Sequence, residues 1–247
     1  MRVGHGWDGW DYGCMEVPNH FAMSPEEVHE LLSGIGAADL VTTHASGLVA
    51  TYLPFLLDPN IGEHGALITH VARNNRQWSD PVLGDAMVIV HGADHYISPR
   101  WLPSLAEHGH VVPTWNYLTV HAYGHLVVHD DPQWTRDAVS RLTAAHETQY
   151  SVDDVPGDYV DRMLRAIVGL EIRLTRVEAK AKMSQNKAPD DVRGIIDGLG
   201  RQADDRPAVM TAAWMADRSV PAAERRHALI EQVALTRRAP TAPGPSE

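Results

Sequence analysis

The chain has 247 residues, a formal net charge of −11 with neutral histidines, and one cysteine, Cys14. This length fits one large domain, or a domain of about 200 residues with a tail. A single cysteine excludes an internal disulfide, so we expect packing to hold the fold and the cytoplasm to be its compartment. The acidic charge argues against non-specific capture of nucleic acid, which needs Lys and Arg to neutralise phosphates. No apolar run approaches the ~20 residues of a spanning helix, so we expect no membrane insertion.

The N-terminal part predicts an extension followed by a well-capped helix. Residues 1–14 are rich in Gly and aromatic residues without periodicity, and we expect the folded domain to begin at residue 15. Ser24 can cap a helix, Pro25 suits its first position, and Glu27 completes a capping box. This helix should end near Gly34 or Gly36.

Four β-rich runs follow, at residues 38–44, 47–58, 65–71 and 85–92. Turn signals separate them and no long helix intervenes, so they predict an antiparallel sheet that closes into a barrel. Between the last two runs, residues 72–78 (ARNNRQW) predict one or two helical turns. On such a helix Arg73 and Arg76 would share a face and could hold an anionic group; the alternative is a solvated Arg pair.

Residues 95–117 contain three prolines, three histidines and four Trp or Tyr residues, which predicts a long structured loop. Long loops inside compact domains usually bind something, and this mixture suits a pocket for a planar ligand. The alternative is a rigid connection that only caps the barrel.

The second half predicts a strand at 118–129, helices at 131–148 and 156–166, and the last strand at 169–182. His121, His125 and His129 look like a metal site, but residues four apart on a strand lie ~13 Å apart, too far to share one ion. Pro189 opens another helix. We expect the main domain to span residues 15–200, and 201–247 to be an appendix with a helix at 222–236 and a disordered end.

Four segments together resemble the PaiB family, known as FMN-binding negative transcriptional regulators. They are VPNHFAM at 17–23, HVARNNRQW at 70–78, EHGHVVPTWNY at 107–117 and GLEIRLTRVEAKAKMSQNK at 169–187. The resemblance covers about residues 15–200. It implies a β-barrel with flanking helices (α+β), the FMN-binding split barrel, as a homodimer with a cofactor at the subunit interface.

The sequence is also similar to the haem-dependent piperazate synthases, which close an N–N bond in an N-hydroxylated ornithine. The shared segments are 73–76 and 113–116, so the resemblance leaves FMN and haem b both open. It implies the following cofactor-binding residues: Tyr52, His70, Arg73, Asn75, Trp78, Pro113, Thr114, Trp115, Asn116, Lys182 and Gln185. His70 is the candidate haem axial ligand and Tyr52 the second choice. The structural alternative for His70 is a polar residue that caps the following helix.

The sequence departs from the usual PaiB pattern at three places near the expected pocket. Relatives have a His where this chain has Tyr52, and aromatic residues where it has Leu102 and Ala181. They have a Lys where it has Leu105. Three functions therefore stay open: a regulator that binds FMN or haem, a haem- or flavin-dependent enzyme acting on a small molecule, and a cofactor-free dimer that keeps only the fold. Against the regulator, the sequence shows no helix-turn-helix or basic stripe for DNA.

Overall fold

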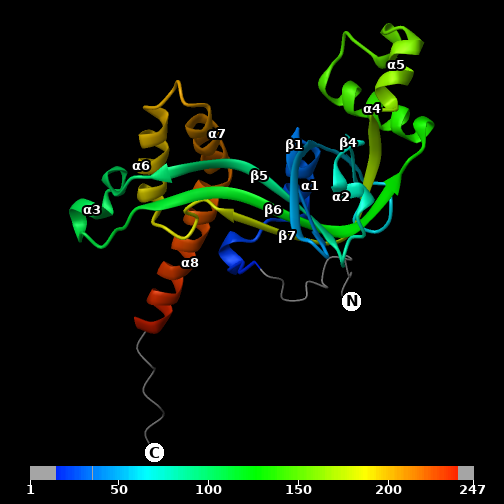
Figure 1. Cartoon of the computed structure of the whole chain (residues 1–247). Coiled ribbons are helices and arrows are strands. Elements are labelled where there is room, and N and C mark those ends of the chain that lie inside the picture. Colours follow the sequence, from blue (N-terminus) through cyan, green and yellow to red (C-terminus); the bar gives the residue numbers. More distant parts are fainter. Residues whose placement is uncertain (1–14, 35, 239–247) are drawn as a thin grey trace, which may run out of the picture. The chain divides into compact units, whose positions relative to one another are not determined.

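The computed structural model describes residues 15–34 and 36–238, which form two compact units. The first contains residues 22–34, 36–92 and 119–180, together with 15–17; the second contains 18–21, 93–118 and 181–238. Three long strands, β5 (Ala86–Ile97), β6 (Thr114–His129) and β7 (Ile167–Lys182), contribute residues to both units (Figure 1). The predicted extension at 1–14 and the predicted disordered end lie outside the described residues. The predicted domain boundaries at 15 and 200 remain predictions.

The first unit is built on a curled antiparallel sheet of seven strands in the order β2-β1-β5-β6-β7-β4-β3. The shorter strands are β1 (Ala37–His44), β2 (Gly47–Pro54), β3 (Leu56–Asp58) and β4 (Ala66–Ala72). β1 and β2 form a hairpin in which His44 pairs with Gly47, and β4 pairs with β7 from Ala66–Arg173 to Ala72–Ile167. The predicted antiparallel sheet is confirmed. The run predicted at 47–58 is two strands, because Pro54 ends β2 and Phe55 turns into the core.

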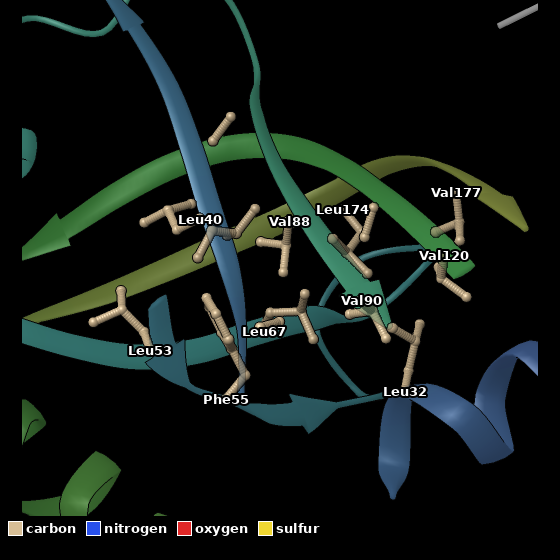
Figure 2. Packing of buried hydrophobic residues seen from close by; sticks show 14 of the residues in the cluster. Leu32, Leu40, Leu53, Phe55, Leu67, Val88, Val90, Val120, Leu174 and Val177 are labelled. Atoms are coloured by element: carbon tan, nitrogen blue, oxygen red, sulfur yellow. The ribbon is translucent and has the colours of Figure 1, made fainter. Parts of the chain in front are cut away.

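The core of this unit lies inside the curl of the sheet. Alternate residues of each strand point inward, as the period of two requires. Figure 2 shows Leu40, Leu53, Phe55, Leu67 and Val88 converging there, and all five are buried. Each fully buried aliphatic or aromatic side chain contributes roughly 1.5–3 kcal/mol through loss of contact with water.

Helix α1 (Pro25–Ser33) follows the predicted signals. Ser24 accepts a hydrogen bond from the Glu27 N–H, the Glu27 side chain accepts from the Ser24 N–H, and Gly34 is the C-cap. Val28 and Leu32, one turn apart, bury the inner face of the helix. The capping box and the apolar stripe therefore both predicted this helix correctly.

The loop predicted at 95–117 is shorter in the structure, so that prediction is wrong at both ends. β5 runs to Ile97 and β6 begins at Thr114, which leaves 98–113. Within it, a 3₁₀ turn (η2, Pro99–Trp101) and helix α3 (Ser104–Glu107) use two prolines near their starts. Proline has no N–H to donate to a neighbouring strand. Pro99, Pro103 and Pro113 all lie between β5 and β6, so they set where these strands end and begin but do not prevent them.

Two helices of the first unit follow β6, and both were predicted. α4 (Pro132–His146) is capped by Asp131, and α5 (Gly157–Leu164) comes after a short 3₁₀ turn, η3 (Val152–Asp154). α4 packs on the outer side of β7 at Gly169, where an added Cβ would lie 2.3 Å from the Trp134 ring. The glycine therefore lets helix and strand approach closely.

The second unit carries α6 (Pro189–Gly200), α7 (Arg206–Trp214), a π-helical turn (Met215–Ser219) and α8 (Val220–Arg238). The helices predicted from Pro189 and at 222–236 are confirmed, whereas α7 was not predicted. The Trp101 ring packs on α6 at Gly198, where an added Cβ would lie 2.3 Å from the ring. Among the helices of the described ranges, none is long and apolar enough to cross a membrane.

Candidate functional site

The predicted cofactor residues fall into two groups, one in each unit. The upstream group lies in the first unit: Tyr52, His70, Arg73, Asn75 and Trp78. The downstream group lies in the second unit: Pro113, Thr114, Trp115, Asn116, Lys182 and Gln185. Each group is described within its own unit.

Arg73 lies just past the end of β4, where hydrogen bonds fix its guanidinium. Its Nε donates to the Arg165 carbonyl at 2.8 Å, and its Nη2 donates to Asp130 Oδ1 at 2.6 Å and to the Ile167 carbonyl at 3.1 Å. The Trp78 indole donates to the Arg73 carbonyl at 2.9 Å, so these two predicted residues are in contact. Asp130 raises the pKa of Arg73, and the guanidinium is therefore a fixed positive charge.

The predicted pairing of Arg73 and Arg76 on one helical face is wrong. Helix α2 (Arg76–Ser79) is capped by Asn75, so Arg73 lies before the helix begins. Arg76 forms an exposed ion pair with Asp80, one turn along α2. The Asn75 cap also overturns the alternative that His70 caps this helix.

Gln77, which is fully buried, ties α2 to the β1–β2 hairpin. Its Nε2 donates to the Leu40 carbonyl at 3.1 Å and to Thr42 Oγ1 at 2.9 Å, and its Oε1 accepts from Thr51 Oγ1 at 2.6 Å. The Gln77 N–H also donates to Asn75 Oδ1 at 2.8 Å. Asn75, predicted to bind a cofactor, therefore has a structural role as a cap within a buried polar network.

Replacing Gln77 with Ala should lower the free energy of unfolding by about 2–3 kcal/mol, because several buried polar groups would lose their partner. Chemical denaturation measures the change. Gln149→Ala, at an exposed position, is the control and should change stability by less than about 0.5 kcal/mol. Equal effects of the two substitutions would contradict the role assigned to the network.

His70 is a largely buried imidazole on the outer face of β4. It pairs with Gly169, and strand alternation places it on the same face as Ile68 and opposite the core residue Val71. Its Nδ1 is buried and has no hydrogen-bond partner among the described residues. Burial lowers the pKa of His70, so the ring is neutral at pH 7 and retains a lone pair that can bind a metal.

Tyr52 lies on the edge strand β2, where it pairs with Asp39 of β1. Its side chain is 68% exposed and it points away from the core, since its neighbour Leu53 is buried. Leu48, on the same face of β2, is 75% exposed. The edge of the sheet therefore presents two large apolar or aromatic side chains to its surroundings.

In the second unit, Lys182 brings together the start of β6 and the end of β7. Its Nζ donates to Thr114 Oγ1 and, at 2.6 Å, to the Trp115 carbonyl. The Trp115 ring is about half exposed, donates from Nε1 to Asp94 Oδ2 at 2.7 Å and lies 6.2 Å from the Tyr96 ring. Pro113, just before β6, is exposed. Lys182 is thus held by oxygen acceptors of the segment that was predicted to face the cofactor.

Asn116 and Gln185 are buried, and their side-chain groups serve the fold. Asn116 Oδ1 accepts from Ser184 Oγ at 3.0 Å, and its Nδ2 donates to Met215 Sδ at 3.4 Å. Gln185 bonds the Met183 N–H and the Ala181 carbonyl. Ser184 has a φ of 64°, a left-handed conformation that costs a non-glycine residue about 1 kcal/mol. The SQN segment is therefore a tightly bonded turn.

The structure also reveals a polar cluster that the sequence analysis missed. Glu171 is buried, and its carboxylate accepts hydrogen bonds from His129 Nε2 at 2.8 Å and from Arg173 Nε at 2.6 Å. The His129 ring stacks on Trp134 at 3.9 Å with an interplanar angle of 6°. Burial acts to raise the pKa of Glu171, but Arg173 and His129 outweigh it and the net shift is downward. The sequence feature that could have indicated this cluster is the position of the Glu171 carboxylate between the apolar residues Leu170 and Ile172.

The three histidines of β6 lie in different environments. His125 pairs with Asp85 at 3.0 Å and His129 with Glu171, while burial is the main cause of the lowered pKa of His121. Within the described residues, no group of three or more His, Cys, Asp or Glu side chains could hold a metal ion.

The chain is similar to a known protein family and to several known proteins. Residues 15–176 match the family described as "Putative FMN-binding domain". Protease synthase and sporulation protein PAI 2 of Bacillus subtilis is 27% identical over 190 residues, which cover 75% of this chain and 89% of that protein. Uncharacterized protein AN0679 of Emericella nidulans is 27% identical over 186 residues, or 61% of this chain and 74% of that protein.

Among solved structures, the conserved hypothetical protein Rv2991 of Mycobacterium tuberculosis superimposes with a TM-score of 0.49 and 13% identity. The superposition covers 68% of this chain and 91% of that one. The family match, together with the curled antiparallel sheet and its flanking helices, confirms both the predicted split barrel and the resemblance to PaiB.

Proposed function

Because this chain belongs to the Putative FMN-binding domain family, we propose that it binds a planar redox cofactor, and that the cofactor is haem b ligated by His70. The single observation that carries the proposal is the His70 imidazole, whose buried Nδ1 has no partner in the described part of the chain and whose pKa is lowered by burial. A neutral imidazole with an unused nitrogen suits an axial ligand of haem iron. FMN is the alternative cofactor, and the family's description favours it.

The positive charge available in the upstream group supports haem over FMN in this proposal. The phosphate of FMN carries close to two negative charges and is usually held by several donors. Arg73 is already paired with Asp130 and two carbonyls, so among the described residues only its Nη1 has no hydrogen-bond partner. One such group can meet a haem propionate, whereas it offers little to a phosphate. The predicted cofactor contacts of the downstream group and of Tyr52 remain predictions.

Haem would supply an iron centre with an open coordination position for redox or bond-forming chemistry. The residues of this chain would then have distinct tasks. His70 would hold the cofactor in place through a ring kept neutral by burial, and Arg73 would orient an anionic group near the end of β4. Trp78, bonded to the Arg73 carbonyl, would keep this turn rigid.

The absorbance spectrum of the purified protein, repeated after addition of hemin or FMN, tests the proposal. We expect an intense band near ~400 nm that saturates at one hemin per chain, as for ligated haem. Paired bands near ~375 and ~450 nm would instead identify a flavin. No spectral change with either cofactor would refute both and leave a cofactor-free protein that keeps only the fold.

With haem, we propose an enzyme acting on a small molecule, such as an N-hydroxylated amino acid in N–N bond formation. A negative transcriptional regulator is the alternative. The net charge of −11 supports the enzyme, because a DNA-binding protein gains most of its affinity from Lys and Arg contacts to phosphates. A salt-dependent footprint of the isolated protein on DNA would favour the regulator.

We also propose a homodimer. The edge strand β2 exposes Leu48 and Tyr52, and an unpaired sheet edge with apolar side chains favours a partner. Purified protein should elute near twice 27.2 kDa in size-exclusion chromatography with light scattering. A clean monomer at micromolar concentration would contradict the proposed dimer.

A further inference from the structure

A cavity of about 500 Å³ lies in the first unit between α4 and the outer face of β4 and β7. Its size is in the range of small-molecule binding sites. Ile61, Ile68, Trp134 and Ala138 form its apolar walls. No residue of this cavity belongs to the cofactor residues predicted from the sequence.

The polar lining of the cavity includes two carboxylates. Glu171 lies at the floor on β7, and Asp137 lies on α4. Arg141 also lines the cavity, but its Nη2 donates to Asp58 Oδ2 at 2.8 Å. A backbone hydrogen bond from Asn60 is the largest cause of a lowered pKa at Asp58, and Arg141 lowers it further, so Asp58 is charged.

The charges around the cavity do not balance. Glu171 is paired with Arg173 and His129, and Asp58 with Arg141. Asp137 has no ion pair in the described part of the chain and accepts one hydrogen bond, from Gln133 Nε2 at 3.1 Å, so its charge is not neutralised. Both oxygens of Glu171 already accept one hydrogen bond each, and a carboxylate oxygen can accept a second. A cationic group would therefore find uncompensated negative charge and free acceptor capacity at the floor of an otherwise apolar cavity.

We propose that this cavity is a binding site for a small organic amine, whose ammonium group bonds Glu171 and Asp137 and whose apolar body lies against Ile61, Ile68 and Trp134. A charged hydrogen bond to a buried carboxylate is stronger than a neutral one, so the ammonium group supplies specificity as well as affinity. None of these residues is assigned to the proposed cofactor, although Ile68 shares the outer face of β4 with His70.

The test compares three probes of equal length by isothermal titration calorimetry at pH 7: n-hexylamine, 1-hexanol and hexanoate. We expect saturable 1:1 binding of hexylamine, about tenfold weaker binding of hexanol, and no binding of hexanoate. Equal binding of hexylamine and hexanol would overturn the proposal, because the cavity would then be merely apolar. Lack of saturable binding by hexylamine would overturn it as well.

Variants locate the binding in the cavity. Ser140 lines it from α4, so Ser140→Leu should fill the space and weaken hexylamine binding more than tenfold. Asp137→Asn removes an exposed carboxylate at the cavity, and it should weaken binding several-fold with the far-UV circular dichroism unchanged. Its control is Asp153→Asn, whose carboxylate pairs with Arg136 outside the cavity. Unchanged affinity in both Ser140→Leu and Asp137→Asn would refute this location.

Discussion

Gly124→Ala should lower the free energy of unfolding by about 3 kcal/mol or more, because the new methyl group would collide with the backbone of the next strand. Gly124 lies within β6, and an added Cβ would lie 2.2 Å from the Arg173 carbonyl oxygen of β7. A flexible side chain could turn aside, but a strand backbone can yield only if β6 and β7 separate. A loss of this size in a chain of this length lowers the melting temperature by roughly 10 °C.

Gly157→Ala is the matched control for this substitution. Gly157 is the first residue of α5, and an added Cβ there would meet no atom within 4 Å. We expect the free energy of unfolding to change by less than about 0.5 kcal/mol, and to rise rather than fall. Thermal unfolding of both variants by circular dichroism makes the comparison. If Gly124→Ala matched Gly157→Ala, the close approach of β6 and β7 described here would be wrong.

Much of the fold could be predicted because local signals and the tertiary structure agree. The capping box of Ser24 and Glu27 set the start of α1, and Asp131 with Pro132 set the start of α4. The strands were predicted from apolar alternation, and the alternating residues Leu170 and Ile172 of β7 both lie in the core. The loop predicted at 95–117 was too long, because proline stops a strand only at its own position.

The candidate site was less predictable, because partners far apart in the sequence decide what each polar residue does. Arg73 meets Asp130, which is 57 residues away, and Gln77 meets carbonyls of a hairpin that precedes it. The resemblance to PaiB assigned cofactor contacts to Asn116 and Gln185, yet the fold already uses both side chains in hydrogen bonds. Glu171 was missed because a carboxylate in an apolar strand shows its partners only in three dimensions.

His70→Ala should abolish tight haem binding, whereas Tyr52→Phe should leave it intact. The reason is geometric: His70 offers a buried, neutral nitrogen without a partner among the described residues, while Tyr52 lies largely exposed on the sheet edge. Loss of the axial ligand should weaken hemin affinity by more than tenfold and shift the band near ~400 nm. Thermal unfolding of both variants without hemin controls for damage to the fold.

The most direct test of the account is the hemin titration of His70→Ala with and without free imidazole, read at the band near ~400 nm. We expect the variant to lose the spectrum of the unmodified protein and to regain it when millimolar imidazole takes the place of the missing side chain. A His70→Ala variant that binds hemin with an unchanged spectrum and affinity would contradict the assignment of His70 as the ligand.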